Sequence, residues 1–311
     1  MANAYTLYAI AVGTDVIKQI SSCRIDPGIQ EMLVSGDSSL DNEHVSLQSQ
    51  TPIVRFTTTA ITAALDLLGV GGLVIDESVE SNGVDLFFRR RTMGAGFADG
   101  DSHVKLTINL GLMYPMTLQA GHGGEPASID AELTCIYDGV NNPIVIAKDQ
   151  ALADLSPAVN EVYTIGPWWV NGVRIAPVQD LTVDFGLQTQ AVQGDGDVWA
   201  TGMAFHRREA SMRCTSLDMP LLDETLGLSI AGKARTGITR AFLRKKALGG
   251  GLVPDATAEH VKLEVAEGRI NPQEFGGDHQ GQATLSLQVT PTWDGANAPI
   301  TYVKNVAVSG A

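Results

Sequence analysis

Apolar and polar residues alternate along much of the chain, as they do in β-strands that have one buried and one solvated face. Residues 104–110, 181–185 and 285–289 show this alternation most regularly. Asp138-Gly139 and Asp294-Gly295 are signals for hairpin turns, and an apolar run follows each of them. The pattern therefore predicts an all-β protein, mainly β with a few short helices.

Three short stretches depart from this alternation and have helical character. Residues 59–69 are rich in alanine and leucine, start with a threonine suited to an N-cap and end in glycine. Residues 218–226 are their counterpart in the second half, with Pro220 in the first turn, where proline is tolerated. Residues 148–155 form the third stretch. We therefore expect tandem β-sandwich or small barrel domains, each with a flanking helix.

The second half of the sequence repeats the first half in the same order. The tetrapeptide HVKL at 103–106 recurs unchanged at 260–263, and several weaker matches keep nearly the same spacing. Chance could give one such match, but hardly an ordered series. We therefore predict two copies of one domain, at residues 1–158 and 159–311.

The spacing between matching segments is not constant. CRIDP at 23–27 resembles VRIAP at 173–177, which is 150 residues later, whereas RFTT at 55–58 and RCTS at 213–216 are 158 residues apart. This difference predicts that the second copy carries eight extra residues between its two segments.

The composition limits the classes of partner. The chain has 311 residues, and 35 Asp and Glu against 21 Lys and Arg give a formal charge of −14. A general DNA or RNA binder needs a basic face, so this balance argues against one. The dense basic clusters, Arg89–Arg91 and Arg244–Lys246, lie on predicted strands, where neighbouring residues point to opposite faces. We expect these clusters to form ion pairs with acidic groups.

Residues that could carry chemistry are few and scattered. Cys23, Cys135 and Cys214 are far apart and lack metal-ligand spacing, which predicts free thiols. The glycines at 94–96 and 249–251 do not complete a phosphate-binding motif, and no catalytic triad or carboxylate pair is legible. We therefore expect no enzyme and no catalytic, cofactor-binding or metal-binding residues.

Targeting segments are not expected either. The N-terminal sequence has no basic region before its apolar residues, and no apolar run reaches 18 residues. The pattern predicts a protein made in the cytoplasm, without a signal peptide or membrane span.

A long polar stretch lies between the early strands of each copy. It covers residues 35–43 in the first copy and 188–197 in the second. Two readings are open: a solvated loop, or an arm that contacts another subunit. The candidate contact residues are Leu40, Asp41, Glu43, Val45, Leu187, Asp195, Asp197, Val198 and Trp199.

Three features together give the chain a family resemblance. They are the Arg-Ile-Asp-Pro-Gly segment at 24–28, the strand-then-helix segment at 53–69 and the polar stretch between them. In this layout the chain resembles the major tail tube proteins of long-tailed, siphovirus-like bacteriophages. The resemblance covers both copies and rests on layout, because none of these segments is a diagnostic motif.

The resemblance implies a structural virion protein of the phage tail. Its members form rings of six tube domains that stack into a tube, so a duplicated domain implies a homotrimeric, pseudo-hexameric ring. The implied partners are further rings, the tape measure, the tail tip and the tail terminator. DNA would pass during ejection through an acidic lumen without specific binding, and the candidate residues above would contact the next ring.

Two alternatives stay open at this point. Another ring of the phage tail, at the tip or the terminator, would share the fold. A tandem β-sandwich that binds a ligand would instead expose an aromatic platform, yet Trp168 and Trp169 lie at the domain junction and Trp199 lies in the region of the predicted arm.

Overall fold

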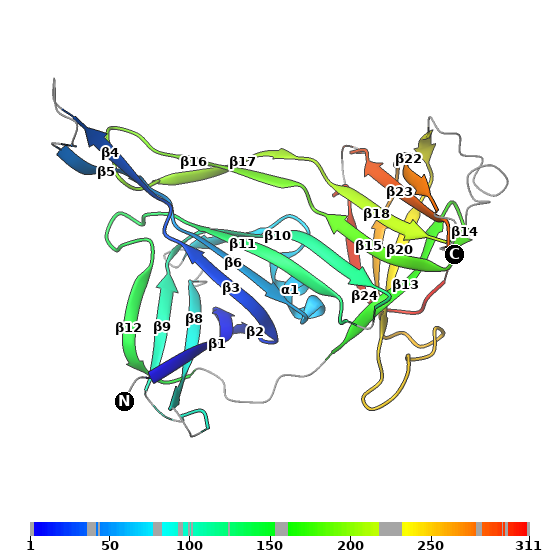
Figure 1. Ribbon diagram of the computed structural model, residues 1–311, viewed down its shortest axis with the longest axis horizontal. Helices are drawn as coiled ribbons and strands as arrows, with labels where there is room; N and C mark the ends of the chain where they lie inside the picture. The colour runs from blue at the N-terminus through cyan, green and yellow to red at the C-terminus, as the bar shows by residue number, and fades with distance from the viewer. Residues whose placement is uncertain are drawn as a thin grey trace.

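The computed structural model describes residues 3–35, 42, 44–76, 83–92, 96–98, 100, 102–123, 125–152, 161–217, 232–277, 282–293, 295 and 298–309. These residues form 24 strands and one helix (Figure 1). The all-β prediction is confirmed.

The first twelve strands, with the helix, are called copy one here. Its elements are β1 (Asn3–Val12), β2 (Asp15–Ile17), β3 (Ile20–Asp26), β4 (Ile29–Val34), β5 (His44–Gln50), β6 (Ile53–Thr58), α1 (Ile61–Leu68), β7 (Leu73–Asp76), β8 (Val84–Thr92), β9 (His103–Ile108), β10 (Leu110–Gly121), β11 (Ser128–Cys135) and β12 (Val145–Gln150).

The remaining twelve strands are called copy two. They are β13 (Tyr163–Val170), β14 (Val173–Ile175), β15 (Val178–Asp184), β16 (Leu187–Val192), β17 (Gly202–Arg208), β18 (Ser211–Ser216), β19 (Lys233–Thr236), β20 (Thr239–Lys245), β21 (His260–Val265), β22 (Gly268–Gly276), β23 (Thr284–Pro291) and β24 (Thr301–Val306). The boundary expected at residue 158 lies outside the described residues.

The strand order of the two copies is the same. One five-stranded sheet has the order β12-β9-β8-β1-β2, and the other has β24-β21-β20-β13-β14, which is the same order twelve strands later. The arms repeat as well, because β4 pairs with β5 and β16 pairs with β17 with a register shift at the matching place. We call β4–β5 arm one and β16–β17 arm two. Each strand of copy one therefore has a counterpart in copy two.

A ten-stranded sheet runs through both copies. Copy two contributes β22-β23-β18-β15 and copy one contributes β10-β11-β6-β3, in that order across the sheet. The short strands β7 and β19 pair with β10 and β22 respectively. The two halves meet where β15 pairs with β10, so one sheet joins the two copies (Figure 1).

The register corrects the predicted spacing between the copies. Arg24 of β3 lies opposite Arg55, and Thr182 of β15 lies opposite Arg213, so β15 is the counterpart of β3 at a spacing of 158 residues. The segment at 173–175 is β14, the counterpart of β2. The match between 23–27 and 173–177 was therefore wrong, and copy two has no eight-residue insertion there.

The same turn follows β3 and β15, which supports their being counterparts. The amide of Gly28 donates to Asp26 Oδ1 (3.0 Å), and the amide of Gly186 donates to Asp184 Oδ1 (2.8 Å). Both glycines have positive φ, 59° and 62°, at the base of an arm. This Asp-x-Gly turn is conserved between the copies because it redirects the chain from the sheet into the arm.

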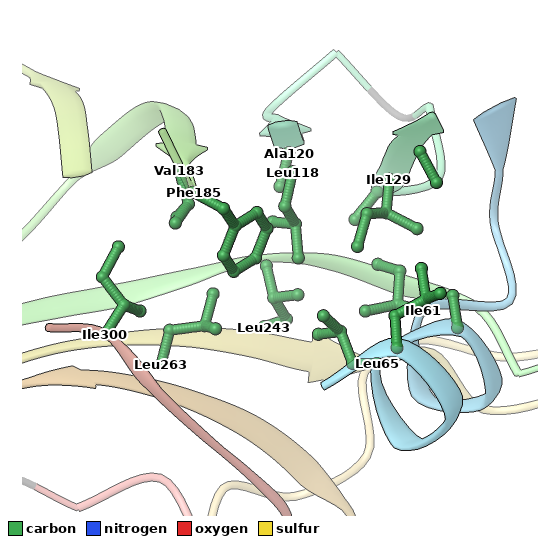
Figure 2. Close-up of a cluster of buried hydrophobic side chains, with 14 of the residues drawn as sticks. Ile61, Leu65, Leu118, Ala120, Ile129, Val183, Phe185, Leu243, Leu263 and Ile300 are labelled. Atoms are coloured by element: carbon green, nitrogen blue, oxygen red, sulfur yellow. The ribbon is translucent and has the colours of Figure 1, made fainter. Parts of the chain in front are cut away.

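The hydrophobic core lies between the ten-stranded sheet and the five-stranded sheets, and it is continuous across the copies. Figure 2 shows part of it, where α1 meets strands of both copies. Ile61 and Leu65 of α1 belong to the same buried cluster as Leu243 and Leu263 of copy two. The helix is therefore part of the contact between the copies.

The helical predictions are confirmed only in part. α1 forms within the segment predicted at 59–69, but its N-cap is Ala60 and no side chain caps it; Thr58 Oγ1 accepts the amide of Ala60 (3.0 Å) instead. Residues 148–150 are in β12, because pairing with β9 overrides their local helical character. The segment 218–226 lies outside the described residues. Among the described residues, no helix has the length and apolar content needed to cross a membrane.

The first prediction concerns the base of arm two. A Cβ on Gly186 would lie 2.0 Å from the backbone carbonyl of Glu209, at a positive φ. We expect Gly186→Ala to lower the free energy of unfolding by about 3 kcal/mol, because it adds a steric clash to the backbone strain. Urea denaturation of the chain measures this loss.

Gly172→Ala is the matched control. Gly172 also has a positive φ, 77°, but nothing lies within 4 Å of its added Cβ. It should cost only about 1 kcal/mol. Equal losses for the two variants would contradict the importance of the close backbone approach at the arm.

Candidate assembly surface

The contact between the copies has the form of an assembly interface. β10 and β15 pair antiparallel, with Leu118 opposite Val183 and Gln119 opposite Thr182. The amide of Phe185 extends the pairing by donating to Met116 O (3.0 Å). The side chains of Leu118, Val183 and Phe185 are fully buried. The sheet therefore continues from one copy into the other with a dry core beneath it.

Polar contacts from α1 reinforce this contact. Thr62 Oγ1 donates to Glu161 Oε2 (2.7 Å), and Lys245 Nζ lies 3.3 Å from Glu161 Oε1. Lys304 Nζ of β24 donates to Asp66 Oδ2 (2.5 Å). Burial alone would raise the pKa of Glu161, but the hydrogen bonds from Thr62 and Lys245 outweigh it, and the pKa is lowered. The charged carboxylate thus stabilises the contact between the copies.

Arm two extends from β15 and β18 of copy two over copy one (Figure 1). Arg208 Nη2 at its base donates to Val70 O (2.6 Å). Phe205 packs edge-on against Tyr114 of β10, with 6.2 Å between the ring centroids. Arm two is therefore seated on copy one along much of its length.

The far end of arm two is anchored by aromatic contacts. Trp199 packs against Tyr137 at 4.7 Å between ring centroids, and its Nε1 donates to Gln50 Oε1 (3.1 Å). The amide of Gln50 also donates to Val198 O (2.6 Å). Since Gln50 ends β5, the tip region of arm two reaches the base of arm one.

The contact is head-to-tail, so it leaves two complementary edges unused. Copy one uses β10, and copy two uses β15, the counterpart of β3. In the described sheet, β3 is therefore the open edge of copy one. The counterpart of β10 in copy two is β22, whose first half pairs with β19 while residues 274–276 have no strand on that side among the described residues.

Apolar side chains are exposed at both unused edges. Phe275 is 51% exposed, whereas its counterpart Leu118 is fully buried. Trp293 is 72% exposed and takes the place that Tyr137 has in copy one. At the other end of the molecule Ile25, half-buried, is the counterpart of the fully buried Val183.

A hollow of about 300 Å³ adjoins the β3 edge. Its lining includes Ile25, Pro27, Leu106, Ile144 and Ile146, and Ile146 is 65% exposed. The counterparts of these residues in copy two belong to the core that copy one covers; they are Val183, Phe185, Leu263, Ile300 and Tyr302. This surface is therefore less covered in copy one than in copy two, although Leu106 is buried in both settings.

The face of the ten-stranded sheet away from the core is polar. Arg55 Nε donates to Glu132 Oε2 (2.6 Å), and the Tyr114 hydroxyl donates to Glu132 Oε1 (2.5 Å). Burial and this hydrogen bond raise the pKa of Tyr114 to about 12. Among the described side chains of the eight long strands, acids outnumber arginines on this face: they are Asp26, Asp130, Glu132, Asp180, Asp184 and Glu274, against Arg24, Arg55, Arg213 and Arg269.

The structure places the predicted contact residues in different surroundings. Leu40, Asp41 and Glu43 lie outside the described residues. Val45 is exposed on β5, and Asp195 and Asp197 are exposed at the turn of arm two. The remaining three belong to the intramolecular seat of arm two or to its base: Leu187 starts β16, and Val198 and Trp199 contact copy one.

Sequence reasoning missed the residues that distinguish the sheet edges paired inside the chain from the edges without a partner strand. Ile25, Ile146, Phe275 and Trp293 are ordinary apolar residues of strands or turns in the sequence. The signal that could have found them is the repeat itself, because each has a counterpart that is covered in the other copy. Using that signal requires the strand pairing, which the sequence does not specify.

Other predicted features can be placed as well. Arg244 pairs with Asp255, and Lys245 pairs with Glu161 and Glu259, which confirms the ion pairs expected of the second basic cluster. In the first cluster, Arg89 and Arg91 lie over the ring of Phe97.

The chemistry of the described side chains offers no reactive cluster. The three cysteines are free thiols, and burial raises the pKa of Cys23 to about 11 and of Cys135 to about 12. No group of three or more His, Cys, Asp or Glu within the described ranges could hold a metal ion. His103 and His260 are buried counterparts whose Nδ1 atoms accept the amides of Arg90 and Lys245 (3.1 Å each), which is a structural role.

Comparison with known proteins adds no relative. No protein-family model matches the chain, and no curated protein matches it.

The second prediction concerns the anchor of arm two. Trp199→Ala should lower the free energy of unfolding of the unassembled chain by about 2 kcal/mol, because it removes an aromatic contact and a hydrogen bond. Trp293→Ala is the control, and it should change the unassembled chain by about 0.5 kcal/mol or less, since Trp293 is largely exposed. Chemical denaturation at low protein concentration compares them, and similar losses would refute the anchoring role.

The third prediction concerns the pH dependence of the contact between the copies. Because the folded pKa of Glu161 is lowered, its stabilisation is present at neutral pH and is lost as pH falls below the ordinary value of 4.5. Glu161→Gln should lower the free energy of unfolding at pH 7 by about 1 kcal/mol. The gap from the unmodified chain should close at acid pH.

The exposed carboxylate of Glu125 supplies the control for this measurement. Glu125→Gln should follow the unmodified chain across the same pH range. If the Glu161→Gln gap stayed constant down to pH 3, the charge of Glu161 would not be the stabilising group.

Proposed function

We propose that this chain is the tube-forming structural protein of a long-tailed phage tail, and that three chains close into a pseudo-hexameric ring. The observation that carries the proposal is the head-to-tail contact between its two copies. That contact uses one edge of each copy and leaves the complementary edges, β3 and the free part of β22, at the two ends of the chain.

Such a contact is suited to repetition. A heterologous interface extends without limit unless its rotation divides the circle, in which case it closes into a ring. The layout that this sequence shares with tail tube proteins favours closure with six domains. Since each chain supplies two domains, three chains complete the ring.

The polar face of the ten-stranded sheet would line the lumen of this ring, where arm two leaves it uncovered. Its acids outnumber its arginines, as described above, and the whole chain carries a charge of −14. A wall with this balance repels phosphate, so DNA would slide past it during ejection without binding specifically.

Stacking of rings would use the tips of the arms. Val45, Asp195 and Asp197 are exposed there and are available to a neighbouring ring. The tape measure, tail tip and terminator proteins would meet the tube inside and at its ends, and the assembled product would be the virion tail.

The fourth prediction tests this function directly. Purified protein at high concentration should form species with three times the mass of the 32.9 kDa chain, and stacks of them, since open sheet edges and exposed apolar side chains become covered. Mass photometry and negative-stain microscopy should show rings with a central hole, and tubes. A chain that stays monomeric at all concentrations would contradict the proposal. That result is expected of a tandem ligand-binding module.

A further inference from the structure

We infer which residues face each other where two chains of the ring meet. The strand β3 of one chain pairs antiparallel with β22 of a neighbouring chain, with Ile25 opposite Phe275 and Arg24 opposite Gly276. This inference rests on the proposed ring and goes beyond it, because a ring could close through other surfaces. The template is the seam that the structure already contains between β10 and β15.

Shared irregularities fix which residues are counterparts. β10 has a register shift between Pro115 and Thr117, and β22 has one between Pro272 and Glu274. Pro115 therefore corresponds to Pro272, which makes Leu118 the counterpart of Phe275. Within the chain Leu118 lies opposite Val183, and the counterpart of Val183 is Ile25.

Burial supports the same register. Leu118 and Val183 are fully buried at the internal seam, whereas Phe275 is 51% exposed and Ile25 is half-buried in the single chain. Pairing in this register turns both side chains toward the core side of the sheet, where the hollow beside Ile25 is open to receive apolar groups. The direction of Phe275 is set by its pairing with Leu285, so a shift by one residue would instead place it opposite Arg24 or Asp26, which point to the polar face.

The charges of the seam are compatible with this register. It brings Glu274 opposite Asp26, whose Oδ1 already accepts the amide of Gly28. Arg24, two residues away on the same face, then lies diagonally across from Glu274 and offsets the repulsion between the two acids.

Placing the neighbouring chain in this register, as copy two is placed on copy one, also seats arm one on that chain. Leu47 takes the place of Phe205, and Trp293 takes the place of Tyr137. This accounts for the exposed Leu33 and Leu47, which lie on one face of arm one, whereas Met32 and Val34 point to the opposite face. Arm one is thus a clasp between chains of one ring, as arm two is a clasp within a chain.

A cysteine cross-link tests the register. In a chain carrying Cys23→Ala, the pair Arg24→Cys and Gly276→Cys would face each other across the seam, and a Cβ at Gly276 has open space. Opposite residues of an antiparallel pair lie within disulfide range. Mild oxidation should link most chains into reducible dimers and trimers on a denaturing gel.

The matched control moves the thiols out of register. Ser22→Cys with Glu274→Cys, in the same background, places them four residues apart along the strands, about 13 Å. It should give less than a tenth of the cross-linked product. Rings of three chains that cross-link through the control pair, or through neither pair, would overturn the register while leaving the ring itself standing.

A second variant needs no cysteine. Phe275→Glu should abolish the three-chain species while leaving the melting temperature of the unassembled chain unchanged, because Phe275 is exposed before assembly. Leu248→Glu, at a 98% exposed position, should leave assembly intact. If Phe275→Glu still assembles as the unmodified chain does, the register is wrong; if the unmodified chain itself never assembles, the proposed function falls with it.

Discussion

The backbone pairing between β10 and β15 is the interaction on which the rest of the molecule depends. β10 is long enough to serve two partners on one side: β7 pairs with Leu110–Met113, and β15 pairs with Thr117–Gly121. Without this pairing, the backbone N–H and C=O groups of β10 and β15 at the junction would lie on exposed sheet edges. Because the junction is made inside the chain, the core beneath it closes over α1 and both five-stranded sheets become parts of one hydrophobic cluster.

Two copies of one fold thus have different surfaces for a purely geometric reason. Among the described residues, copy two has its β3-type edge covered and part of its β10-type edge without a partner strand, and copy one has the reverse. Residues that are counterparts in the fold, such as Val183 and Ile25, therefore have different exposure. The difference reflects which neighbour each copy has rather than any difference in its own folding.

Much of this fold could be predicted from the sequence, because the period of two in a strand leaves a direct trace in the order of residues. The all-β class followed from that trace, and the segment of α1 followed from its alanine-rich spacing. Residues 148–150 misled the prediction because strand pairing, a contact distant in sequence, decided their conformation. The spacing of 150 residues misled it too, since a short resemblance in side chains carries less information than the turn made by Asp184 and Gly186.

The candidate assembly surface was largely beyond prediction. The sequence suggests Trp199 as a contact to another subunit, yet in the structure it packs against Tyr137 and donates to Gln50 of copy one. Which strand edge is free depends on the partner that each edge has found, and a single sequence records no partners.

The polarity of the chain, with one kind of edge at each end, has a consequence for the growth of the proposed ring. A pair of joined chains shows the same two edges as one chain does, so each intermediate would accept the next chain in the same way, and no partly built ring would be a dead end.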